Sequence, residues 1–167
     1  MRRTGGSRSV EAVYDALAPG VLGYFRSHRM RDPEGLTGDV FVAVTERLGR
    51  FRGDDAALRR WVFTIAHHRR VDEIRRDQRR AEAWDVLPAP PWDDAEAIDP
   101  ALVAALNALT PEQREVVVLR FVADLPVAAV ADIVGRSSGA VKMLQQRSVE
   151  ALAASLDPPR GTASPSP

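Results

Sequence analysis

Apolar residues recur along most of the chain at the three-to-four-residue spacing of an amphipathic helix, and almost no stretch alternates at every second position. This spacing predicts helices over about residues 9–29, 37–51 and 56–80. Pro19 and Gly20 predict a break or kink within the first helix. The second helix has one apolar side, and its opposite side carries Asp39, Val42, Ala43, Glu46 and Arg50. We therefore predict an all-α fold.

The C-terminal part of the chain carries the boundary signals of further helices. Residues 110–113 (TPEQ) place Thr at the N-cap, Pro at the first helical position and Gln where it closes a capping box. A short helix restarts after Pro126 and stops at Gly135, and Ser137 caps a last helix that reaches about residue 156. A short helix, a tight turn and a longer helix are the spacing of a helix-turn-helix.

The last of these helices has the composition of a DNA-recognition helix. On a helical projection, the inward-facing residues are Val141, Leu144, Ser148, Ala151 and Leu152. The outward-facing residues are Gly139, Lys142, Met143 and Gln146. The basic residues Arg136, Lys142 and Arg147 meet no acid between positions 136 and 149. Basic side chains can pair with the phosphates of DNA, and the amide of Gln146 can pair with the major-groove edge of adenine. An ordinary helical hairpin with a solvated face is the alternative.

The helix predicted over residues 56–80 has no plain solvent face. Apolar side chains lie on two of its sides, with Leu58, Val62 and Ile65 on one and Phe63 and Ile74 on the other. Residues 58–80 also hold eight Arg against three acids. Basic residues interleaved with aromatics suit single-stranded nucleic acid. The alternative is that Trp61 and Phe63 are core residues and that the arginines at 75–80 form a solvated helix end.

Charge is segregated along the chain although Lys and Arg (23) balance Asp and Glu (23) overall. Residues 81–100 hold six acids, no base and four prolines, which is typical of a linker. Residues 157–167 are rich in Pro and Ser and are expected to form a disordered tail. We therefore predict two small helical domains, 9–80 and 101–156, joined by an acidic, Pro-rich linker.

Several classes of protein are disfavoured by what the sequence lacks. There are no cysteines, hence no disulfides or thiolate ligands, and the adjacent His67 and His68 point about 100° apart on a helix and cannot share a metal. We expect no metal and no cofactor. No nucleophile elbow or glycine-rich phosphate loop supports an enzyme. No apolar run approaches the roughly 18 residues of a membrane span, so we expect a cytoplasmic protein without a membrane partner.

Five segments follow one another in an informative order: GDVF, FRGDD, LRRWVFTIAHHRRVDEIRR, LTPEQREVVVLRF and a helix-turn-helix containing AVK. Over about residues 9–156 this order resembles the extracytoplasmic-function sigma factors of RNA polymerase. The resemblance implies a specificity subunit that catalyses nothing and directs promoter-specific transcription initiation. Its implied partners are promoter DNA and core RNA polymerase, through the clamp helices of the largest subunit and the flap. The resemblance leaves an anti-sigma factor open as a further partner.

The resemblance also implies a role for individual residues. The contact with the clamp helices falls on Asp39, Val42, Ala43 and Glu46. The loop 52–57, which captures a flipped base of the −10 element, includes Arg52, Gly53, Asp54 and Asp55. Further −10 contacts fall on His67, His68 and Arg69, where His68 replaces a frequent Asn, and on Arg75, Arg76, Arg79 and Arg80. The −35 duplex is read by Arg136, Ser137, Ser138, Gly139, Lys142, Met143, Gln146 and Arg147.

Two other functions remain open from the sequence alone. In a conventional DNA-binding regulator, residues 1–80 would form a sensor or dimerisation module, and the C-terminal half would bind operator duplex. Such a module does not need the basic, aromatic helix over residues 56–80. A helical adaptor that binds no nucleic acid would leave both clusters of arginines unexplained.

Overall fold

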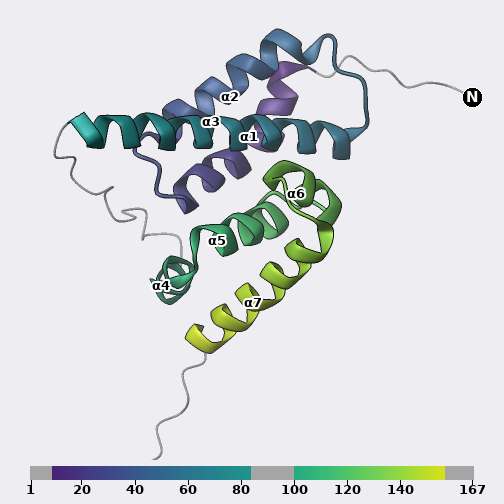
Figure 1. The fold of residues 1–167 in the computed structure, drawn as a ribbon. Coiled ribbons are helices and arrows are strands. Elements are labelled where there is room, and N and C mark those ends of the chain that lie inside the picture. The colour runs from purple at the N-terminus through teal and green to yellow at the C-terminus, as the bar shows by residue number, and fades with distance from the viewer. Residues whose placement is uncertain (1–8, 84–99, 157–167) are drawn as a thin grey trace, which may run out of the picture.

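The computed structural model describes residues 9–83 and 100–156, and within these ranges all regular structure is helical (Figure 1). The elements are α1 (Val10–Ser27), α2 (Pro33–Leu48), α3 (Asp55–Ala83), α4 (Pro100–Ala108), α5 (Pro111–Val117), the π-helix η1 (Val118–Val122), α6 (Val127–Val134) and α7 (Ser138–Leu156). The predicted all-α class is confirmed. Most of the expected linker and the whole expected tail lie outside the described residues.

Helix boundaries follow the capping residues. Ser9 accepts the Ala12 N–H at 3.1 Å, and Asp32 accepts the Gly35 N–H at 2.8 Å, so α2 begins at Pro33, ahead of the predicted residue 37. The capping box predicted at residues 110–113 is present. Of the break or kink predicted at Pro19, the break is absent: α1 runs on through the proline, whose neighbours such as Val21 are buried.

The chain between α5 and α6 winds more widely than an α-helix. The Ala123 N–H donates to the carbonyl of Val118 at 3.0 Å, which is the i to i+5 pairing of a π-helix. This winding buries Leu119 and leaves the large side chain of Phe121 58% exposed.

Helices α1, α2 and α3 pack together through fully buried side chains such as Val21, Val40 and Val62. Helices α4 to α7 pack around Leu119, Val130 and Val141 (Figure 1). We call α1–α3 the N-terminal half and α4–α7 the C-terminal half. The predicted helix-turn-helix is present as α6, the turn at Gly135 and α7.

The two halves are in direct contact. The buried apolar residues of both form one continuous cluster. The η1 segment lies against α1 at two glycines: a Cβ added at Gly23 would lie 3.5 Å from Cγ1 of Val122, and one at Gly20 would lie 3.8 Å from the Val122 carbonyl oxygen. Small residues on α1 therefore allow this close approach.

Candidate nucleic-acid and polymerase interfaces

The loop between α2 and α3 is held in shape by its own contacts. Phe51 stacks on Trp61 of α3, with ring centroids 5.2 Å apart and ring planes at 23°. The Nη1 atom of Arg52 donates to the carbonyls of Gly49, at 3.1 Å, and of Phe51, at 2.9 Å. A Cβ on Gly53 would approach the Phe51 ring to 2.9 Å, so this position has no room for a side chain. Trp61 thus supports the loop from a half-buried position, in line with its interpretation as a packing residue.

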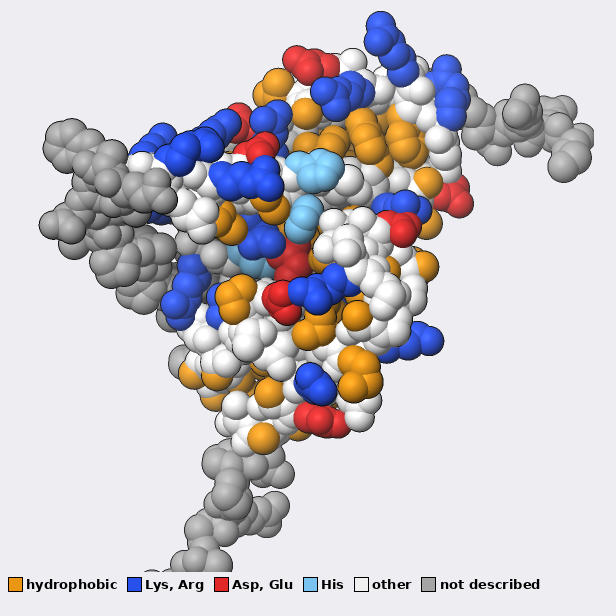
Figure 2. All heavy atoms as spheres, viewed as in Figure 1, with side chains coloured by type: hydrophobic (Ala, Val, Ile, Leu, Met, Phe, Trp, Pro, Cys, Tyr) orange, Lys and Arg blue, Asp and Glu red, His pale blue; other side chains and the backbone are white. Residues whose placement is uncertain are grey.

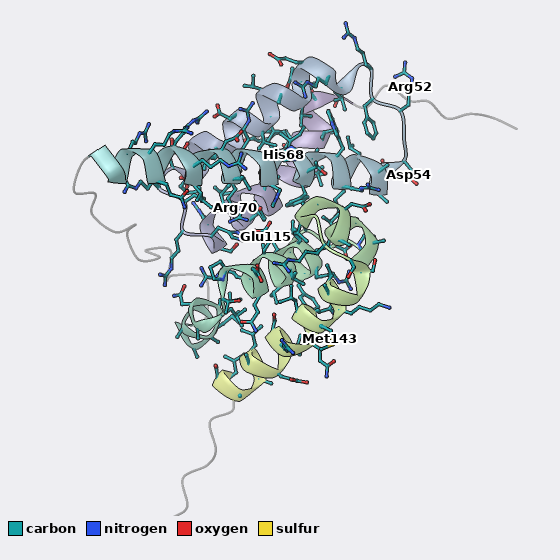
Figure 3. The ribbon with its side chains drawn as sticks, viewed as in Figure 1. Arg52, Asp54, His68, Arg70, Glu115 and Met143 are labelled. Atoms are coloured by element: carbon teal, nitrogen blue, oxygen red, sulfur yellow. The ribbon has the colours of Figure 1, made fainter. Side chains whose placement is uncertain are left out.

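The loop and the predicted −10 histidines lie at separate points along α3 (Figure 3). Asp54 caps the helix by accepting the Ala57 N–H at 2.8 Å, and Asp55 is its first residue. From Asp55 to His68 the helix rises about 20 Å at 1.5 Å per residue. The two regions therefore lie too far apart to form one small pocket.

The adjacent histidines differ in environment. His68 has an exposed side chain, whereas His67 is half-buried and its Nδ1 lies 2.9 Å from Oε1 of Glu115 in the C-terminal half. Arg69 is half-buried. The His67 ring is engaged between the two halves in this arrangement, and its expected −10 contact stays a prediction.

The basic end of α3 is partly neutralised within the helix. Arg76 pairs with Glu73 at 3.1 Å, and Arg80 lies 3.9 Å from Glu73 and 3.6 Å from Asp77. The side chains of Arg75 and Arg79 are exposed. Figure 2 shows basic side chains gathered along α3, with histidine rings where the two halves meet.

The predicted polymerase-binding side of α2 is largely exposed. Asp39 and Glu46 are exposed, and Val42 is 60% exposed, which is high for a large apolar side chain. The expectation for Ala43 is wrong, since this residue is only 6% exposed: α2 packs on α1 and on α3, and two neighbours require a wider apolar arc than one. Val42 and Glu46 line a groove between α1 and α2 whose other side includes Tyr14.

The turn before α7 has the expected capping geometry. Gly135 ends α6 in the left-handed conformation, with φ 67° and ψ 36°, which glycine adopts without a steric penalty. The Ser137 hydroxyl accepts the Ala140 N–H at 3.2 Å and caps α7. Arg136 pairs with Glu112 of α5.

The predicted division of α7 into two faces agrees with its burial. Val141 and Ser148 are buried, and the residues expected to face DNA are exposed: Ser138, Gly139, Lys142, Met143, Gln146 and Arg147. Gln146 Nε2 donates to Oε1 of Glu150 at 2.9 Å along the helix. Figure 3 shows Met143 on α7, in the half opposite the α2–α3 loop.

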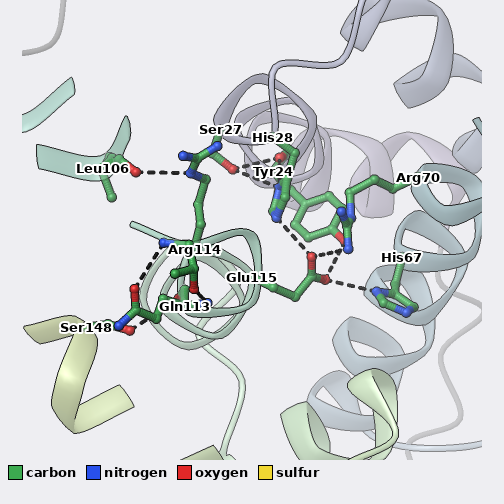
Figure 4. Close-up of polar contacts among 11 residues, drawn as sticks. Tyr24, Ser27, His28, His67, Arg70, Leu106, Gln113, Arg114, Glu115 and Ser148 are labelled. Atoms are coloured by element: carbon green, nitrogen blue, oxygen red, sulfur yellow. Dashed lines mark hydrogen bonds and ion pairs between the residues drawn. The ribbon is translucent and has the colours of Figure 1, made fainter. Parts of the chain in front are cut away.

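A buried carboxylate, which the sequence reasoning did not single out, joins the two halves. The Glu115 side chain on α5 is only 6% exposed, and it bonds to four side chains of the N-terminal half (Figure 4). The Tyr24 hydroxyl donates to Oε1 at 2.7 Å, His67 Nδ1 lies 2.9 Å from Oε1, His28 Nε2 lies 2.9 Å from Oε2, and Arg70 forms an ion pair with Oε2. The one sequence signal was an acid directly beside the apolar run 116–119.

The partners of Glu115 hold one another in place. Arg70 Nε donates to the Tyr24 hydroxyl at 3.0 Å, and His28 Nδ1 lies 2.7 Å from the Tyr24 carbonyl. The two ring nitrogens of His28 thus face the Tyr24 carbonyl and the Glu115 carboxylate. A separate hydrogen bond joins the two halves nearby, where Arg29 Nε donates to Oδ1 of Asn107 at 3.0 Å.

The cluster shifts the ionisation of two of its members. Burial alone would raise the pKa of Glu115, but hydrogen bonds from His28 and His67 and the charge of Arg70 hold that pKa well below its usual range. Burial, together with the negative charge of Glu115, raises the pKa of Tyr24 well above its usual range. At neutral pH the site therefore holds a carboxylate and a neutral phenol.

Within residues 9–83 and 100–156, no group of three or more His, Asp or Glu side chains is arranged to hold a metal ion. In the same ranges, no helix has both the length and the apolar character to cross a membrane.

Two family models match the chain. The model described as "Sigma-70 region 2" matches residues 13–80, and that described as "Sigma-70, region 4" matches residues 105–154. The ECF RNA polymerase sigma factor ShbA of Streptomyces griseus is 32% identical, over 86% of this chain and 87% of that protein. This chain belongs to the extracytoplasmic-function (ECF) sigma factors.

The sigma factor also resembles longer relatives. It is 32% identical to the ECF RNA polymerase sigma factor BldN of Streptomyces coelicolor, over 78% of this chain but only 53% of that protein. It thus spans about half the length of that relative. Its family is that of the promoter-recognising sigma factors of RNA polymerase, which are transcription regulators and not classical enzymes.

Solved structures share the fold of this sigma factor. RpoE from Bartonella quintana, in complex with the anti-sigma factor NepR, matches with a TM-score of 0.75 at 21% identity, over 90% of this chain and 98% of that one. CnrH, in complex with the cytosolic domain of CnrY, matches with a TM-score of 0.62 at 23% identity, over 92% and 91%.

Proposed function

We propose that this sigma factor binds core RNA polymerase and opens promoters by holding an unpaired base of the −10 element in the α2–α3 loop. The observation that carries the proposal is the loop's own bracing, by the Phe51–Trp61 stack and by Arg52, at the start of the basic helix α3. A loop already in shape loses little conformational entropy when it binds a base. The exposed His68 and the arginines near the end of α3 would contact other nucleotides of the same strand.

The −35 element would be read as duplex by the exposed face of α7. Lys142 and Arg147 offer charge to phosphates, and Gln146 offers an amide to a base edge. The polymerase clamp would contact Asp39, Val42 and Glu46 on α2, next to the groove at Tyr14. The polymerase flap is the proposed contact of the C-terminal half.

The proposal includes no catalytic step. Duplex opening is favoured when unpaired bases bind better than paired ones, so binding alone shifts the equilibrium. We further propose that the protein acts in the cytoplasm and that residues 9–80 and 101–156 are separate domains. An anti-sigma factor is a further proposed partner.

Sigma-free core RNA polymerase provides the test. The full chain should co-elute with the core enzyme in gel filtration and should direct transcription from a promoter that the core enzyme alone ignores. A protein that binds promoter duplex, yet neither associates with core enzyme nor supports initiation, would instead be a conventional DNA-binding regulator.

A further inference from the structure

The groove between α1 and α2 is large enough to hold a small organic molecule. Its volume is about 580 Å³, and pockets for small ligands usually span about 300–1,000 Å³. Tyr14 belongs to its α1 wall, and Phe41 and Val42 belong to its α2 wall. The rings of Tyr14 and Phe41 meet edge to face, with their centroids 4.8 Å apart. Phe41 is buried, whereas Tyr14 is 48% exposed, so about half of the Tyr14 surface is available to a ligand.

Gly38 leaves room in the α2 wall of this groove. A Cβ built at Gly38 would meet no atom within 4 Å, so the position opens onto free space. Residues three or four positions apart share one side of a helix, and Gly38 therefore lies on the same side of α2 as Phe41 and Val42. Glycine is unfavourable inside a helix, and no neighbouring atom here requires the absence of a side chain. The consequence of this glycine is therefore a wider groove.

The walls of the groove carry negative charge. Glu11 and Asp15 lie four positions apart on α1, and Glu46 lies on α2. All three side chains are exposed, and the described residues that line the groove include no lysine, arginine or histidine. Like charges four positions apart on a helix repel one another, so a cation placed between the walls would relieve this repulsion. The groove thus combines an apolar, aromatic surface with a preference for positive charge.

We propose that this groove binds a small apolar organic cation, a molecule with a hydrocarbon or aromatic body and an amine that is protonated at neutral pH. The body packs against Val42 and the Tyr14 ring, and the ammonium group lies near the carboxylates, where the aromatic ring attracts it as well. Val42 and Glu46 also belong to the face proposed for the polymerase clamp. A bound cation therefore competes with core RNA polymerase, and this regulatory part rests on the proposed function.

Two fluorescent probes test the preference for charge. Dansylcadaverine and dansylglycine share one fluorophore and carry opposite charges, and the rise and blue shift of dansyl emission report binding to the full chain without polymerase or DNA. Dansylcadaverine should bind at least about ten-fold more tightly than dansylglycine, which corresponds to about 1.4 kcal/mol. Equal affinities, or no saturable binding of dansylcadaverine, would overturn the proposal.

A pair of glycine substitutions locates the probe. Gly38→Leu fills the groove without a clash, and because leucine favours helices more than glycine does, the protein should stay folded. It should abolish the binding of dansylcadaverine. The matched control is Gly49→Leu at the end of α2, where a Cβ also meets no atom within 4 Å but the residue does not line the groove. Circular dichroism verifies the fold of both variants. Undiminished binding by Gly38→Leu would place the probe on another surface and overturn the proposal.

The carboxylates are tested by changing charge at constant shape. The double variant Glu11→Gln with Glu46→Gln should bind dansylcadaverine several-fold more weakly and dansylglycine no more weakly than the unsubstituted chain does. Glu150→Gln removes an exposed acid of α7, outside the groove, and should leave both affinities unchanged. An unchanged ratio of the two affinities in the double variant would show that these carboxylates do not select the ligand.

Core RNA polymerase provides the test of competition. Saturating dansylcadaverine should reduce the fraction of the full chain that co-elutes with core enzyme, and dansylglycine at the same concentration should not. Unchanged co-elution with the groove occupied would overturn the regulatory part. A chain that binds dansylcadaverine but never associates with core enzyme would instead count against the proposed function. If a basic amphipathic peptide binds in a manner that Gly38→Leu abolishes, while dansylcadaverine does not bind, the groove belongs to a protein partner and the small-ligand proposal is wrong.

Discussion

The carboxylate of Glu115 pairs with the guanidinium of Arg70, although the two residues belong to segments matched by separate family models. A charge buried at such a boundary is costly unless it is paired and hydrogen-bonded, and Glu115 has its partners only while the halves touch. The contact therefore couples the ionisation of one carboxylate to the arrangement of the whole molecule.

Acid should weaken the molecule through Glu115. Its pKa is lowered in the folded state, so its contribution to stability is fully present above the unfolded-state pKa of about 4.3 and is lost as pH falls below that value. The urea midpoint should fall between pH 6 and pH 3.5, and it should fall less in Glu115→Gln. At pH 7, Glu115→Ala should cost about 3 kcal/mol, because it leaves buried cations without their partner. An equal acid response in both proteins would assign the effect to other carboxylates.

Tyr24 should behave oppositely on the alkaline side. Its raised pKa means that its contribution to stability is present below about pH 10 and is lost as pH rises through the range in which the unfolded chain ionises. Ultraviolet absorbance should show the Tyr24 phenolate only as the protein unfolds. Tyr24→Phe should delete that component, and a phenolate component that appears in the folded protein and disappears in Tyr24→Phe would contradict the expectation.

Asp54 should separate folding from promoter opening. Because it caps α3, Asp54→Ala should cost about 1 kcal/mol of unfolding free energy, while Asp54→Asn keeps a capping side chain and should cost much less. If the carboxylate itself contacts a flipped base, Asp54→Asn should still lower the permanganate reactivity of −10 thymines. Normal reactivity in Asp54→Asn would leave the cap as the residue's only role.

His68 offers a cleaner test of strand binding, since its side chain is exposed and contributes little packing. His68→Ala should leave the urea midpoint, core association and −35 binding unchanged while reducing promoter opening, and a pre-melted template should restore transcription. His67→Ala should instead lower stability, because its ring contacts Glu115. Identical effects of the two substitutions would argue against this division.

The face of α7 should divide into positioning and sequence-reading residues. Lys142→Ala should lower the salt dependence of −35 duplex binding by about one unit of log–log slope for each phosphate that the lysine neutralises. Gln146→Ala should cost about 1–3 kcal/mol at one base pair and relax the preference there. Glu150→Ala removes the internal partner of Gln146 and should leave preference unchanged. Unaltered promoter choice in the Gln146 variant would locate base reading elsewhere.

The sequence predicted which side of a helix is buried better than it predicted which elements pack against that helix. The inward Val141 and outward Lys142 followed from periodicity, and the capping box at Thr110 followed from local spacing. Ala43 was misassigned because a helix projection does not reveal that α2 packs against two partners. Glu115 was missed for a related reason: its contacts with Tyr24 and His67 join distant parts of the chain, and no local pattern encodes such a pairing.

The five residues of η1 also determine the orientation of the helices that follow them. A π-turn holds one residue more than the matching α-turn, and each residue of an α-helix advances the chain by about 100° around its axis. The extra residue therefore changes the orientation of the helices after Ala123, including the exposed face of α7. Deleting one residue here would restore α-helical winding and turn the helix-turn-helix away from its present bearing, with every DNA-facing side chain still in place. The orientation of the proposed DNA-binding face relative to the rest of the protein thus depends on the winding of η1, a segment that carries none of the proposed DNA contacts.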